Sequence, residues 1–227
     1  MNRAVRTRIA VWKQPAESLD WLALCLRFAN TADWHASPHP KESLETYQDL
    51  LAWAVRNSLL SRREAARLMG RASAQPRRAR EALARAVTVR EAIYRIMSGL
   101  AHGDELAGRD LATLNKTLGG ALRRTRIAGR GDTGRFAWEI AGRIDDFDRV
   151  LWPLLKSAAD LLTSTELRRV KQCADDRGCG WLFLDRSKNL SRRWCSMKGC
   201  GNRAKVLQYY RRARGRTRRL TIIHNVR

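Results

Sequence analysis

The chain of 227 residues lacks the marks of a membrane or secreted protein. No segment approaches the roughly 20 apolar residues that a membrane-spanning helix needs. The basic start, Met1 to Arg6, is followed by no apolar h-region, so we expect no secretory signal and a cytoplasmic location. Apolar residues are nonetheless not scarce, because 44% of the chain is hydrophobic and 30% is charged. That balance is typical of a folded globular protein rather than a disordered one.

Catalytic signatures are also missing. The glycine-rich span 129–134 lacks the Gly-Lys-Ser/Thr ending of a phosphate-binding loop. The four histidines show no pattern of partners that would make a nucleophile triad. The acidic pairs Asp145-Asp146 and Asp175-Asp176 are adjacent residues, which point to different faces or lie in loops and do not suit acid–base work. We therefore predict that the protein is not an enzyme.

Acidic residues are few, since 22 Asp and Glu stand against 45 Lys and Arg, a formal net charge of +23. The excess is concentrated in residues 168–227, where 18 basic residues face three acids, a charge of +15, which leaves +8 for the first 167 residues. Such a field attracts polyanions, nucleic acid first and an anionic membrane surface second, whereas the plain alternative is a solvated basic face. Arginine dominates lysine here and binds phosphate through two donors, so we favour a nucleic-acid partner over the solvated face.

Apolar residues recur at helical spacing through most of the chain before the cysteine-rich end, which predicts a helical domain over residues 17–163. Ser61 and Glu64 form a capping-box pattern, and Pro76 sits where the first turn of a helix tolerates proline. A long apolar stripe then runs up to Gly103. The predicted helices cover residues 17–30, 42–57, 61–70, 76–103, 108–118 and 147–162.

Two further patterns complete this domain. The runs 123–128 and 135–140 flank the glycine-rich span and predict a small β-hairpin. Thr163 with Glu166 forms another capping-box pattern, which predicts a helix into Lys171 and marks the domain boundary.

Four of the five cysteines lie within 28 residues, as Cys173-x5-Cys179 and Cys195-x4-Cys200. In a chain without an export signal, two close pairs predict a four-thiolate site for one structural zinc ion, with a redox dithiol pair as the alternative. Four protein sulfurs leave no position for water or substrate, so we expect no zinc-hydrolase chemistry. The fifth, Cys25, lies on an apolar helical face and is interpreted as a buried inert thiol.

The cysteine-rich segment is predicted to be a module over residues 164–214. Residues 181–185 are strand-like, 191–194 suit a return strand, and 203–214 suit a helix, which together predict a treble-clef-like ββα zinc finger. So small a module lacks a sufficient core, and we expect it to be unfolded without metal. The basic tail covers residues 215–227. The fold class is therefore mainly α, a helical N-terminal domain with a small β-hairpin followed by this finger.

The residues around the cysteines carry a family resemblance. Cys200-Gly201-Asn202-Arg203, with Trp194-Cys195-Ser196-Met197 and Cys179-Gly180-Trp181-Leu182-Phe183 before it, resembles the CGNR zinc finger. The upstream segment resembles the ABATE domain, which accompanies this finger in bacterial proteins described as stress-induced transcription regulators. Its matching residues are Leu24-Cys25-Leu26, Phe28-Ala29-Asn30-Thr31, Tyr47, Leu50, Leu51, Trp53, Arg90-Glu91-Ala92-Ile93-Tyr94 and Leu114-Asn115. The resemblance covers about residues 20–214 and implies zinc binding by the four cysteines and a role in transcription.

Basic side chains in and around the predicted finger helix are the candidates for nucleic-acid contacts. They are Arg192, Arg193, Arg203, Lys205, Arg211, Arg212 and Arg214. Arg203 has a second interpretation of at least equal weight, because a residue beside the last ligand can bond backbone carbonyls or offset the thiolates. Asn30, Thr31 and Trp34 are candidates for a small-molecule pocket, although capping of the loop and core packing by Trp34 explain them equally well.

These observations predict a DNA-binding transcriptional regulator whose helical domain senses a ligand or a partner. An RNA- or ribosome-associated zinc protein is the alternative, because zinc and an arginine-rich tail suit structured RNA as well as duplex DNA. A small-molecule-modifying enzyme is a third class, for which the sequence offers no constellation of catalytic residues.

Overall fold

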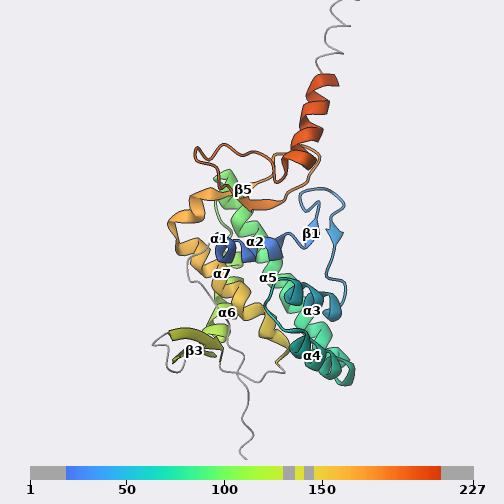
Figure 1. Ribbon diagram of the computed structural model, residues 1–227, viewed down its shortest axis with the longest axis vertical. Coiled ribbons are helices and arrows are strands. Elements are labelled where there is room, and N and C mark those ends of the chain that lie inside the picture. Colours follow the sequence, from blue (N-terminus) through green and yellow to red (C-terminus); the bar gives the residue numbers. More distant parts are fainter. Residues whose placement is uncertain (1–18, 130–135, 141–145, 211–227) are drawn as a thin grey trace, which may run out of the picture.

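The computed structural model of the protein describes residues 19–129, 136–140 and 146–210 (Figure 1). Helices make up most of these residues, so the predicted mainly helical class is confirmed. The helices of the N-terminal part are α1 (Leu19–Leu22), α2 (Leu24–Ala29), α3 (Tyr47–Arg56), α4 (Arg62–Ala74), α5 (Pro76–His102), α6 (Gly108–Leu122) and α7 (Leu151–Thr163).

Local signals set several helix ends. In α4 the Ser61 hydroxyl accepts a hydrogen bond from the Glu64 amide, and the Glu64 carboxylate accepts one from the Ser61 amide. Pro76 occupies the first turn of α5, where a missing amide hydrogen costs nothing. Gly103 ends α5 with a φ of 76°, a left-handed conformation that glycine adopts without strain. The predicted start at Ser61 and the predicted span of the long helix are therefore confirmed.

The long helix α5 is the centre of the helical body. It packs against α2, α3, α4 and α6, and α7 packs against α2 and α6. Ala82 and Ala86 are buried on α5, and such small side chains let neighbouring helices approach closely. Across the core, the Ser157 hydroxyl of α7 accepts from the Cys25 amide at 3.0 Å and donates to the Trp21 carbonyl at 2.8 Å. Cys25 is fully buried, as expected of an inert core thiol.

Two antiparallel hairpins are attached to this helical body. Strands β1 (Ala32–Asp33) and β2 (Lys41–Glu42) bracket the loop after α2. Strands β3 (Thr125–Gly129) and β4 (Phe136–Ile140) pair in register from Thr125 with Ile140 to Gly129 with Phe136. The predicted β-hairpin is thus confirmed, while its glycine-rich turn lies outside the described residues.

The segment after α7 differs from the prediction. Thr163 does not cap a new helix, because its hydroxyl donates back to the Ala159 carbonyl of α7 at 2.9 Å. A short 3₁₀ helix, η3 (Thr165–Arg169), follows, and the chain then enters strand β5 (Val170–Gln172) instead of continuing as a helix into Lys171. The β-branched, buried Val170 favours this extended backbone over a helix.

The hairpin of the cysteine module is also built differently. Strand β6 (Leu182–Leu184) lies within the predicted strand 181–185, but it pairs with β5 and not with residues 191–194. The return strand predicted at 191–194 is therefore wrong. Burial explains why β6 pairs with β5: Val170, Leu182 and Leu184 all pack in the helical core, whereas Arg193 is exposed. A β-hairpin followed by a helix over 202–210 nevertheless confirms the predicted class of module.

Specific polar contacts join the module to the helical body. The Asn30 side chain at the end of α2 donates to the Leu182 carbonyl at 2.8 Å and accepts from the Leu182 amide at 2.9 Å. The Tyr94 hydroxyl of α5 donates to the Gly180 carbonyl at 3.1 Å and accepts from Gln172 at 2.9 Å. The β5–β6 hairpin is consequently part of one continuous core, and the domain limits 17–163 and 164–214 remain a prediction.

Membrane insertion through a helix finds no support in the described part of the chain. None of its helices has both the length and the apolar stretch that would be needed to cross a bilayer.

We predict that Asn30→Ala lowers the free energy of unfolding by about 2–3 kcal/mol, because it leaves a buried amide and a buried carbonyl of Leu182 without partners. Urea denaturation followed by circular dichroism measures the change. Asn115→Ala, at an exposed position of α6, is the matched control and should change stability by less than about 0.5 kcal/mol. Equal effects of the two substitutions would contradict the anchoring role of Asn30.

Candidate metal centre

The four cysteines of the module converge on one point. Cys173 directly follows β5, and Cys179 lies in the loop before β6. Cys195 precedes, and Cys200 lies within, the short turn η4 (Met197–Gly201), which Ser196 caps by accepting a hydrogen bond from the Gly199 amide. The four sulfur atoms all lie within 4.8 Å of one another. Two cysteine pairs separated by fifteen residues are therefore brought to a single centre.

The sulfur geometry fits a tetrahedral metal ion. The Sγ atoms of Cys179 and Cys195 are 3.8 Å apart, and those of Cys195 and Cys200 are 3.6 Å apart. A zinc ion at about 2.3 Å from four thiolates places neighbouring sulfurs about 3.8 Å apart. A disulfide needs about 2.05 Å, and all four cysteines are free. One shared centre, rather than two separate pairs, favours a metal site over the redox dithiol alternative.

The pKa values of the clustered cysteines indicate that full ionisation of all four thiols requires a cation. A hydrogen bond from the Cys195 thiol lowers the pKa of Cys179 to about 5, so this group ionises easily. The same bond raises the pKa of Cys195, and burial raises the pKa of Cys200 to about 12. The first negative charge thus makes each further one costly. A divalent ion removes this repulsion and permits all four thiolates together.

Arg203 lies against the sulfur cluster. Its guanidinium donates to Cys200 Sγ at 2.8 Å and to the Asp175 carboxylate at 3.0 Å. Arg177 bonds the same buried carboxylate, and the hydrogen bonds from Arg177 and then Arg203 outweigh burial and hold the pKa of Asp175 well below its usual range. These contacts match the interpretation in which Arg203 offsets the thiolates, and a direct contact with nucleic acid stays a prediction.

The loop after β1 covers the cluster from the side of the helical body. Trp34 packs against the cysteines, and the guanidinium groups of Arg177 and Arg203 lie 5.5 and 5.3 Å from its ring centroid. Gly178 and Gly180 have φ values of 91° and 65°, and a Cβ atom on them would lie 2.7 Å from Ser37 and 2.6 Å from Ala36. Close packing of backbone on backbone therefore requires glycine at both positions.

Family comparisons agree with this geometry. The model of the family described as a putative stress-induced transcription regulator, ABATE, matches residues 22–165. The chain belongs to this family. A second model, the CGNR zinc finger, matches residues 169–213. A search among curated proteins gave no match. The resemblance seen in the sequence is confirmed, and the cluster is the four-cysteine site of a CGNR finger, consistent with one Zn²⁺.

The basic residues of the CGNR finger fall into two groups. Arg192 is occupied inside the module, where it donates to the Trp194 and Cys195 carbonyls and lies 4.6 Å from the Phe183 ring centroid. Arg193 and Lys205 are exposed. The remaining predicted contact residues, Arg211, Arg212 and Arg214, lie outside the described residues.

The candidate pocket residues of the ABATE domain lie in packed surroundings. Asn30 and Thr31 are buried, and the Thr31 hydroxyl donates to the Phe28 carbonyl at 2.8 Å and accepts from Arg90 at 3.3 Å. Trp34 is the cover of the cysteine cluster described above. These contacts are those of capping and packing, and a ligand pocket at this place stays a prediction.

Asp175 is a functional residue that the sequence did not single out. As one of an adjacent acidic pair it suggested only a loop, yet it is the carboxylate that orients Arg177 and Arg203. Its position two residues after Cys173, in a segment with few acids, was the available signal.

We predict that Cys200→Ser reduces bound zinc from about one ion per chain to less than half, because serine supplies no thiolate to the tetrahedral site. Elemental analysis of the purified, reduced protein gives the stoichiometry. Cys25→Ser is the matched control, since that thiol lies in the helical core, and it should retain the metal. A Cys200→Ser protein with a full complement of zinc would show that the cluster is not the metal site.

We further predict that Arg203→Ala lowers zinc affinity by about 10- to 100-fold, the usual cost of removing a group that bonds a metal ligand. Competition with a chromogenic chelator measures this affinity. Lys205→Ala removes an equal charge from the same helix, and its affinity for zinc should stay unchanged. Indistinguishable affinities would mean that Arg203 serves something other than the metal centre.

Proposed function

We propose that the protein is a zinc-dependent DNA-binding transcriptional regulator, in which the CGNR finger carries the nucleic-acid contacts. The observation that supports this most directly is the position of the helix over 202–210. It begins at the sulfur cluster and projects from one end of the molecule, away from the helical body (Figure 1). A metal-organised base thus holds a cationic helix free for a partner.

The charge of this region suits a polyanion. Arg193, Lys198 and Lys205 are exposed on the finger, and Lys205 belongs to the projecting helix. Residues 211–219, next along the chain, contain six arginines. Arginine and lysine contacts to phosphate supply most of the affinity of a DNA-binding protein, and Gln208 on the exposed helix is of a type that reads base edges.

A sensing, non-catalytic role for the ABATE domain completes the proposal. Four protein sulfurs close the coordination sphere of the metal, so the finger offers no open position for a reaction. The helical domain is then the part free to bind a ligand or a partner, and the Asn30, Tyr94 and Trp34 contacts are a physical connection between it and the finger. As a regulator of bacterial transcription, the protein would act in the cytoplasm.

Binding of structured or single-stranded RNA is a second candidate, and one observation favours it. Tyr209 and Tyr210 expose 71% and 59% of their surface at the end of the projecting helix. Exposed aromatic rings stack on unpaired bases, which duplex DNA does not offer.

We predict that affinity for duplex DNA falls steeply with salt, and that Lys205→Ala weakens binding while reducing the slope of log K against log salt by about 0.9, the value of one lost phosphate contact. Fluorescence anisotropy with labelled duplex and the zinc-loaded protein measures both. Arg80→Ala, exposed on α5, removes the same charge far from the finger and should leave the slope unchanged.

A flat salt dependence of the unmodified protein would overturn the electrostatic basis of the proposal. Selective binding of single-stranded RNA, lost in Tyr209→Ala by a factor on the order of ten or more, would favour the second candidate.

A further inference from the structure

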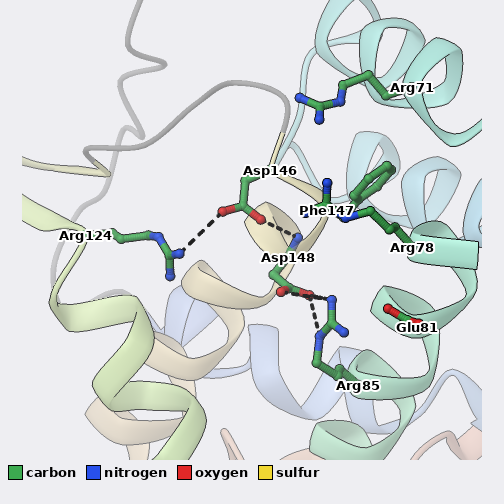
Figure 2. A pocket seen from close by; sticks show the side chains of 8 residues that line it. All are labelled: Arg71, Arg78, Glu81, Arg85, Arg124, Asp146, Phe147 and Asp148. Carbon is green, nitrogen blue, oxygen red and sulfur yellow. Dashed lines mark hydrogen bonds and ion pairs between the residues drawn. The ribbon is translucent and has the colours of Figure 1, made fainter. Parts of the chain in front are cut away.

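An open cavity of about 580 Å³ is lined by residues of α4, of the first half of α5 and of the segment 146–148, together with Arg124 after α6. Figure 2 shows Arg124 on one side, Arg71, Arg78 and Arg85 on the other, and residues 146–148 between them. Asp148 belongs to the 3₁₀ helix η2 (Phe147–Val150), Arg71 to α4, and Arg78 and Arg85 to α5. Four arginines from three places in the sequence therefore face one space, together with the carboxylates of Glu81, Asp146 and Asp148.

A second open cavity of about 430 Å³ adjoins the first and shares Arg85, Arg124 and Asp148 with it. Its wall is more apolar and includes Val89, Leu151 and Trp152. The two cavities together form a cleft with a cationic part and an apolar part, and we name this the η2 cleft.

The arginines of the η2 cleft are not all neutralised by ion pairs. Arg85 makes two hydrogen bonds of 3.0 and 3.1 Å to Asp148. Arg124 forms a longer ion pair of 3.8 Å with Asp146 and donates a hydrogen bond of 3.3 Å to the Gly120 carbonyl. Arg78 donates to the neutral Gln75 amide oxygen at 2.9 Å and has no carboxylate partner among the described residues.

Aromatic rings stand beside these cations. The guanidinium groups of Arg71 and Arg78 lie 5.6 and 5.9 Å from the Phe147 ring centroid, and that of Arg124 lies 5.5 Å from the Trp152 centroid. Tyr47 holds Phe147 in place through an edge-on ring contact and a 3.0 Å hydrogen bond to its carbonyl. The cleft thus offers charge and flat apolar surfaces within reach of one small molecule.

We propose that the η2 cleft binds a small organic anion, with its carboxylate or phosphate at Arg124, which lines both cavities, and its apolar body in the cavity lined by Leu151 and Trp152. The proposed function holds that the helical domain senses a ligand, and the η2 cleft is the site and an organic anion the class of that ligand. Binding itself does not depend on the proposed function, but its regulatory role does. The helix α5 extends from the cleft to the finger, since Arg78 and Tyr94 lie 16 residues, about 24 Å, apart along it.

Isothermal titration calorimetry of the full-length, zinc-loaded protein without nucleic acid tests the proposal. The probes are 2-naphthoate, 2-naphthyl phosphate and the neutral 2-naphthalenemethanol, with acetate and inorganic phosphate as head groups alone. Both naphthyl anions, or the better-fitting one, should bind at least about tenfold more tightly than the neutral alcohol and than their isolated head groups. The ratio between the two anions identifies carboxylate or phosphate as the preferred head.

Two matched pairs of variants locate the site. Arg124→Gln should weaken binding of the naphthyl anion about tenfold, whereas Arg123→Gln, which removes the same charge at the neighbouring exposed residue outside both cavities, should leave it unchanged. Gly120→Leu, where open space meets the glycine in the apolar cavity, should obstruct the ligand body. Gly108→Leu, also in open space on α6 but outside the cleft, is its control. Thermal unfolding verifies that all four variants are folded.

Equal affinities for the naphthyl anions and the alcohol, or equal effects of Arg124→Gln and Arg123→Gln, would overturn the proposal. Because calorimetry with the two matched pairs of variants reports anion binding at the cleft and anisotropy reports DNA binding, failure of either proposal can be recognised without the other. A ligand that binds as predicted but leaves DNA affinity unchanged would retain the site and remove only its link to the finger.

Discussion

Four thiol groups within 4.8 Å of one another cannot all ionise unless a cation lies among them, and the C-terminal module is built around this constraint. The loops that carry Cys173, Cys179, Cys195 and Cys200 have little regular structure besides the β5–β6 hairpin and the turn η4. Metal coordination therefore supplies the tertiary restraint that a larger hydrophobic core gives elsewhere. The direction of the helix over 202–210, which begins two residues after Cys200, depends on the same restraint.

The finger is not an independent appendage of the helical body. Leu182 of β6 is bonded on both backbone atoms by Asn30, and Gly180 is bonded by Tyr94 and covered by the loop that carries Trp34. A small module that shares its core with a larger one gains stability from it, so the hairpin and the metal site stabilise different parts of the segment. Loss of metal should then disorder the cysteine loops more than the β5–β6 pair, which is a narrower effect than the unfolding of the whole module expected from its size.

Helix ends that depend on nearby residues were predicted well, whereas strand pairing and side-chain contacts that depend on distant residues were missed. Capping at Ser61, proline at Pro76 and the left-handed stop at Gly103 act within a few residues, so the sequence alone placed the start of α4 and both ends of α5. The spacing of the cysteines predicted the metal site for the same reason. The partner of β6 depends instead on which strand can bury its side chains against distant helices, and nothing local marks Val170 over residues 191–194. The role of Asp175 likewise depends on Arg203, 28 positions away.

The contacts of Arg203 bear on which charges of the finger remain for a polyanion. Four thiolates and one divalent zinc ion carry a formal charge of −2, and Arg203 lies directly on a sulfur atom and on Asp175. Its positive charge is thus largely neutralised within the module, and so is the charge of Arg177, which pairs with Asp175. The donors of Arg192 are occupied by backbone carbonyls. Side chains without such partners, Lys205 above all, retain their full field in solvent. The Cys-Gly-Asn-Arg motif is therefore best understood as the part that builds the finger, and under the proposed function residues beyond the motif are the ones left to contact the partner.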